Sequence, residues 1–132
     1  MIGRTLGCVV LCGLMASGSM QAHHSLAGVY DMRKEAEVSG SLVSIKFTNP
    51  HGSLTLAVKN ADGTTTEWVM TTGSATTLAE RGIGKSTNAL KPGDTITVKY
   101  IPARNGNPLG FLKTVTLPDG RVIQISLGNP ND

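Results

Sequence analysis

Apolar and polar residues alternate along several short stretches of the chain, most clearly between residues 37 and 60. The alternating apolar positions of this pair of stretches are Val43, Ile45 and Phe47, followed by Leu54, Leu56 and Val58. Alternation at a period of two residues is typical of β-strands with one buried face. We therefore expect two strands joined by the turn Asn49-Pro50-His51-Gly52.

Turn residues and further alternation divide the rest of the chain into more strands and one short helix. The expected strands cover residues 37–47, 53–60, 64–71, 95–101, 109–117 and 121–127. Between the third and fourth strands, Ser74 or Thr76 can cap a helix that Gly82 ends. This order predicts an all-β fold, a small OB-like Greek-key barrel of five to six strands with one short helix between strands three and four. A β-sandwich or another small barrel is the alternative.

Three residues within this frame carry specific expectations. Gly40 interrupts the first strand, which indicates a bulge or a sharp coil of the sheet. Trp68 is the single tryptophan, and we expect it to be a core anchor more than a platform for ligands. Ile83, after the helix, is expected to fill the core below it.

Residues 1–22 have the pattern of a secretory signal peptide. Arg4 precedes an apolar run from Leu6 to Met15, small residues follow, and Ala22 suits the position before a cleavage point. The apolar run is shorter than the roughly 20 residues of a membrane span. We therefore expect export to the periplasm or secretion, with no stable membrane anchor after processing; a retained anchor is the alternative.

The expected division of the chain follows from this leader. We expect the chain to consist of a signal peptide at 1–22, an N-terminal arm at 23–36, a β-barrel domain at 37–127 and a mobile tail at 128–132. Both cysteines, Cys8 and Cys12, lie within the leader, so a processed chain would have no disulfide and no thiolate metal site. The net charge is only +3, without the Lys/Arg clusters typical of nucleic-acid binding, and we expect no nucleic-acid partner.

The three histidines are the candidate metal ligands. Cleavage after Ala22 would make His23 the first residue, whose free amine and imidazole can chelate one ion together. Cleavage after Gln21 would instead place a histidine third, which also forms a square nitrogen chelate. With His24 and His51 as further ligands, such nitrogen sites suit copper(II). The alternative has no ligand role: His23 and His24 are then surface residues at a frayed terminus, and His51 is a turn histidine hydrogen-bonded to the backbone at a strand end.

No catalytic arrangement is visible in the sequence, so we do not expect an enzyme. The acids Asp62, Asp94 and Asp119 each lie next to glycine in turns, where their side chains serve turn geometry. Residues 79–86 satisfy a permissive phosphate-loop pattern, but a helix precedes this stretch where the mechanism needs a strand, which argues against nucleotide binding.

Several motifs taken together resemble a family of small exported bacterial proteins classed as a domain of unknown function. The motifs are His23-His24-Ser25, Asn49-Pro50-His51, Trp68, Leu78, Arg81-Gly82, Leu90-Lys91-Pro92-Gly93-Asp94, Pro102-Ala103-Arg104-Asn105-Gly106 and Asp119-Gly120. The resemblance covers the expected mature chain and implies export, a small β-barrel and a shared role for the histidines. The family often has an acidic residue and a second tryptophan where this chain has Met70 and Ile83.

The function expected from these observations is that of an exported binding module, with copper or another transition metal bound through His23, His24 and His51. The alternative is a metal-free OB-like module that binds a protein or glycan partner in the cell envelope.

Overall fold

The computed structural model describes residues 26–126, and six strands and two short helices make up its regular structure. In chain order the elements are α1 (Leu26–Val29), β1 (Ala36–Lys46), β2 (Ser53–Lys59), β3 (Thr65–Thr71), α2 (Ala75–Glu80), β4 (Thr95–Pro102), β5 (Leu109–Thr116) and β6 (Val122–Gln124). None of the helices within residues 26–126 is long and apolar enough to span a membrane.

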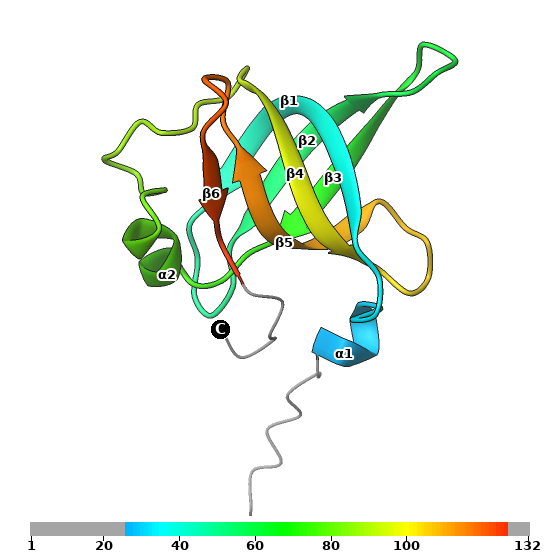
Figure 1. Ribbon diagram of the computed structural model, residues 1–132, viewed down its shortest axis with the longest axis horizontal. Helices are drawn as coiled ribbons and strands as arrows, with labels where there is room; N and C mark the ends of the chain where they lie inside the picture. The colour runs from blue at the N-terminus through cyan, green and yellow to red at the C-terminus, as the bar shows by residue number, and fades with distance from the viewer. Residues whose placement is uncertain (1–25, 127–132) are drawn as a thin grey trace, which may run out of the picture.

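Five of the strands close into a barrel (Figure 1). β1 is central and pairs antiparallel with both β2 and β4. β3 pairs with β2 on one side, and β5 pairs with β4 on the other. The barrel closes where β3 and β5 run parallel, from Val69 opposite Leu109 to Thr71 opposite Phe111. This is the expected OB-like barrel, with α2 between β3 and β4 and with β6 as an extra strand on β5.

The buried residues form two clusters. The larger one fills the barrel with side chains from all five barrel strands, and α2 and the loop after it add Leu78, Ile83 and Leu90. Trp68 is half-buried and packs against this cluster, with its ring edge on Tyr100 at a centroid distance of 5.4 Å. Its role as a core anchor and that of Ile83 as a core plug are therefore confirmed. The smaller cluster contains Tyr30, Ile101, Ala103 and Phe111.

One detail of the expected first strand is wrong. Val43 is 43% exposed, whereas its neighbour Leu42 is buried. The reason is a register shift between Leu42 and Ser44, where an extra residue in β1 reverses the alternation of faces. A bulge, one of the two alternatives expected at Gly40, thus lies at Val43 instead, and Gly40 pairs in regular register with Ile96 of β4. Gly40 has a different role, because a Cβ atom there would stand 2.6 Å from the Ala57 carbonyl oxygen of β2.

The helix boundaries follow from local chemistry. Ser74 is the N-cap of α2, and its side chain accepts a hydrogen bond from Thr77 N at 3.1 Å. Gly82 follows the helix with a φ of 88°, a left-handed conformation that glycine adopts at little cost. The expected cap and stop residues of the helix are therefore both confirmed, with Ser74 rather than Thr76 as the cap.

Replacing Gly110 with alanine tests the packing at the closure of the barrel. The new Cβ atom would lie 2.3 Å from Tyr100 Cδ2 and 2.9 Å from Met70 Sδ. Because both neighbours are held in the core, we expect Gly110→Ala to lower the free energy of unfolding by about 1–3 kcal/mol. Urea denaturation followed by tryptophan fluorescence measures this.

The matched control is Gly28→Ala in α1, where no atom lies within 4 Å of the new Cβ and φ is not positive. We expect this variant to stay within about 1 kcal/mol of the wild type. Equal stabilities for the two variants would contradict the close packing at Gly110.

Candidate functional site

The turn Asn49-Pro50-His51-Gly52 connects β1 to β2 and lies against the chain between β3 and α2. Asn49 Oδ1 accepts a hydrogen bond from Ala75 N, in the first turn of α2, at 3.1 Å. Gly52 N donates to Gly73 O, and Gly52 O accepts from Thr72 N, both at 3.0 Å. Three hydrogen bonds over four residues therefore hold the turn in place at one end of the barrel.

Gly52 is required by this close approach. A Cβ atom at this position would stand 2.4 Å from the Lys46 carbonyl oxygen and 2.8 Å from Thr72 Oγ1. The glycine therefore lets the backbone after His51 pass between the end of β1 and the end of β3, which positions the imidazole.

One ring nitrogen of His51 contacts a backbone carbonyl oxygen, and the other has no hydrogen-bond partner within residues 26–126. His51 Nδ1 lies 3.2 Å from the Thr72 carbonyl oxygen. Because a carbonyl oxygen only accepts, Nδ1 carries the proton in this contact, and in the neutral ring Nε2 then has a free lone pair. His51 is exposed, and Nε2 has no partner among the residues that the structure describes. The alternative without a ligand role expects this bond to the backbone, and a metal-binding histidine commonly donates its other ring N–H to a backbone carbonyl in the same way.

The N-terminal arm reaches the same strand end as His51. The Tyr30 hydroxyl lies 2.7 Å from Thr71 Oγ1, one residue before the Thr72 carbonyl that holds His51. Burial raises the pKa of Tyr30 above 10.0, partly offset by the hydrogen bond to Thr71, so the hydroxyl keeps its proton near neutral pH. The arm and the histidine turn therefore meet at consecutive residues of β3 and its continuation.

Further contacts fasten the arm to the outside of the barrel. Tyr30 forms a β-bridge with Ala103, and Arg104 Nε donates to the Ala27 carbonyl oxygen at 2.9 Å. The Tyr30 ring packs on Phe111 at a centroid distance of 5.8 Å. Tyr30 is therefore buried against the barrel, whereas Val29, its neighbour, is 41% exposed.

Replacing Tyr30 with phenylalanine tests whether the hydrogen bond between the Tyr30 hydroxyl and Thr71 stabilises the packing of the arm on the barrel. Loss of the bond to Thr71 should lower the free energy of unfolding by about 0.5–1.5 kcal/mol, as measured by urea denaturation. Tyr100→Phe is the control, because the Tyr100 hydroxyl has no hydrogen-bond partner within residues 26–126, and it should change stability little. Similar losses in both variants would contradict this role of Tyr30.

The arm continues into a small charge cluster around Asp31. Burial alone would raise the pKa of Asp31, but hydrogen bonds from Arg33 N and Nε, both at 3.3 Å, and the charges of Arg33 and Lys34 lower it below 3.8. A carboxyl group with a lowered pKa stabilises the folded state above its unfolded pKa, and this contribution disappears as the pH falls through the folded pKa.

We therefore expect Asp31→Asn to be less stable than the wild type at pH 7. The difference between the two proteins should shrink as the pH falls below 3.8, because the wild-type carboxyl group is then neutral as well. Urea denaturation of both proteins at pH 7 and pH 3 measures the two differences. A difference that is independent of pH would show that charge does not account for the effect.

Of the three histidines expected as metal ligands, only His51 is among the described residues. His51 lies in the turn as expected, whereas His23 and His24 lie outside the described residues. Within residues 26–126, no group of three or more histidine, cysteine, aspartate or glutamate side chains could hold a metal ion. A complete site therefore requires the histidines that precede α1.

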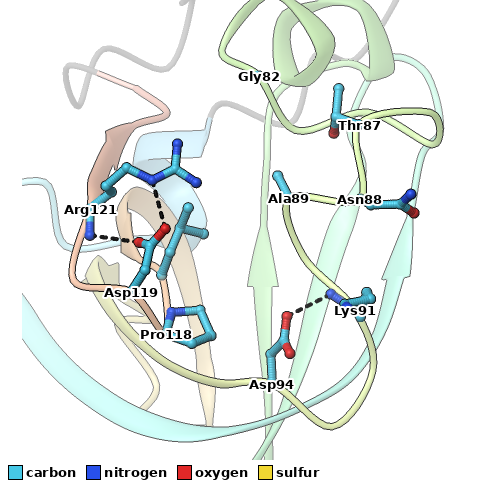
Figure 2. A pocket seen from close by; sticks show the side chains of 10 residues that line it. Gly82, Thr87, Asn88, Ala89, Lys91, Asp94, Pro118, Asp119 and Arg121 are labelled. Carbon is cyan, nitrogen blue, oxygen red and sulfur yellow. Dashed lines mark hydrogen bonds and ion pairs between the residues drawn. The ribbon is translucent and has the colours of Figure 1, made fainter.

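The structure also contains a cleft that was not expected from the sequence. A polar cleft with a volume of about 490 Å³ lies between the α2–β4 loop and the β5–β6 turn (Figure 2). We call this feature the polar cleft; it is formed by residues 82–94 and 117–121. Lys91-Pro92-Gly93-Asp94 and Pro118-Asp119-Gly120 are recognisable in sequence as turns, but nothing local indicates that they face a common cleft.

Comparison with known proteins gives one family. The model of a family described as being of unknown function, DUF6152, matches residues 10–113. No curated protein matches the chain.

Proposed function

The chain belongs to this family of unknown function, and we propose that it is an exported β-barrel binding module that holds copper(II) or another transition metal through His23, His24 and His51. The observation that carries this proposal is the exposure and orientation of the His51 imidazole. Its imidazole stands exposed in a held turn, with Nδ1 occupied by the Thr72 carbonyl and Nε2 available. Such an imidazole is already oriented as a ligand before any metal arrives.

The path of the arm supports the approach of the other two histidines. His24 precedes Leu26 by two residues, so the chain between them spans at most about 7 Å. From α1 the arm leads directly to Tyr30, whose hydroxyl is bonded to Thr71. Because His51 is held by the next residue, Thr72, a short segment separates the candidate ligands from the end of the barrel where His51 lies.

The chemistry of the ligand set favours copper(II). Cleavage of the leader after Ala22 would provide the amine and imidazole of His23, and His24 and His51 would add further nitrogen atoms. Copper(II) prefers tetragonal arrangements of nitrogen and oxygen ligands. The signal-peptide pattern of residues 1–22 supports both the export and the new chain end that this site requires.

Calorimetric titration of the processed protein with copper(II) tests the proposal. We expect binding at one site, and a loss of affinity of about tenfold or more in His51→Ala, which corresponds to about 1.4 kcal/mol or more. Because that variant also removes the bond to Thr72, His51→Asn is the matched variant: its amide can still donate to the carbonyl, but it lacks the imidazole nitrogen. Both variants should lose affinity.

Two further readouts make the result specific. Electron paramagnetic resonance of the copper complex should lose one nitrogen coupling in the His51 variants, and mass spectrometry of the protein taken from the periplasm should show a start at His23 or Ala22. Unchanged copper affinity in both His51 variants would remove His51 from the site.

A metal-free module that binds a glycan or protein partner is the second candidate function, and the polar cleft favours it. OB-like barrels commonly bind ligands across the face of β2 and β3, and in this chain such binding would require an exposed Trp68. Trp68 instead packs against the core, so the cleft is the better candidate on this fold. In both candidates the protein binds rather than catalyses.

A further inference from the structure

The charges around the polar cleft are balanced. Lys91 and Arg121 are opposed by Asp94 and Asp119. Asp119 accepts two hydrogen bonds from Arg121, from Nε at 2.7 Å and from the backbone N at 3.0 Å. Asp94 Oδ2 accepts from Lys91 N at 2.9 Å. The turns themselves therefore orient both carboxylates, and the ion pair with Arg121 neutralises that of Asp119 (Figure 2).

Considerable hydrogen-bonding capacity is left after these contacts. Among the described residues, Lys91 Nζ, the two Nη atoms of Arg121 and the other carboxylate oxygen of Asp94 have no partner. The side-chain amide of Asn88 also has none, and Asn88 is the only described residue other than glycine with a positive φ, 50°. The cleft therefore offers both donors and acceptors, mostly on planar groups that can make two parallel hydrogen bonds.

Three apolar residues also line the cleft. Leu117 lines the cleft and is only 4% exposed, because it belongs to the main core cluster. The other two are Ala89, from the α2–β4 loop, and Pro118, from the β5–β6 turn. The volume of about 490 Å³ falls in the range of pockets that hold small organic ligands.

We propose that the polar cleft binds a neutral saccharide. An anionic ligand would meet Asp94 and Asp119, and a cationic one would meet Lys91 and Arg121, whereas a neutral ligand leaves the existing charge balance intact. Sugar hydroxyl groups both donate and accept, and a pair of adjacent hydroxyls matches a guanidinium or carboxylate group. The C–H face of the sugar ring would contact the apolar lining residues. This proposal rests on the second candidate function, the glycan-binding module, and is independent of the metal site.

Amide chemical shifts of the ¹⁵N-labelled processed protein test the proposal. The probes are the neutral sugars glucose, N-acetylglucosamine, cellobiose and chitobiose, with glucuronate and glucosamine as anionic and cationic counterparts. We expect at least one neutral sugar to shift amides of residues 82–94 and 117–121, and to bind more tightly than its charged counterparts.

Two variants and one control locate the binding. Lys91→Gln removes Nζ but keeps the backbone bond to Asp94, and Asn88→Gly removes the amide from a position whose φ suits glycine. Each should weaken binding about 3- to 10-fold, as expected for one lost hydrogen bond. Lys59→Gln, on an exposed lysine of β2 outside the cleft, should leave binding unchanged.

The contrary outcomes are distinct. Binding of the charged sugars alone would overturn the proposed ligand class. Neutral sugars that shift amides only outside residues 82–94 and 117–121 would overturn the site but leave a glycan-binding function standing. The absence of shifts with all six probes would overturn the saccharide proposal, and copper titration of the same protein would still decide the metal function separately.

Discussion

The parallel pairing of β3 with β5 is the contact on which the arrangement of both candidate sites depends. It covers three residue pairs, from Val69 and Leu109 to Thr71 and Phe111, and it joins strands that are far apart in the chain. Gly110 permits it, since a side chain there would collide with Tyr100 and Met70. Because this pairing closes the barrel, it encloses the main core and brings the end of β3 beside β5, where the arm packs.

The end of β3 gathers segments from three parts of the chain. The Tyr30 hydroxyl of the arm is hydrogen-bonded to the Thr71 hydroxyl. His51, in the turn between β1 and β2, is hydrogen-bonded to the Thr72 carbonyl. Both contacts are held by a strand end that is itself paired on two sides, with β2 and with β5. A ligand site built from the arm and the turn would therefore rest on a rigid support, which lowers the ordering cost of binding.

The polar cleft has a different origin. β5 continues beyond the end of β3, and β6 pairs with that remaining part of β5. The chain between β3 and β4 runs through α2 and a long loop, and Leu90 and Ile83 anchor this loop in the core. The loop and the β5–β6 turn thus flank a space that barrel strands do not fill, and turn residues with charged side chains line it.

Local chemistry in the sequence determined most of the elements: alternation placed β2 and β4, Ser74 and Gly82 bounded α2, and the strand order indicated the barrel. Periodicity failed at Val43, because an extra residue opposite the partner strand reverses the alternation, and the alternation itself does not show where that residue lies. The sequence also singled out His51 as a candidate ligand. Only the tertiary structure decided that Tyr30 and His51 meet at Thr71 and Thr72, and that two ordinary turns face a common cleft, because contacts between distant segments depend on barrel closure and leave no local pattern.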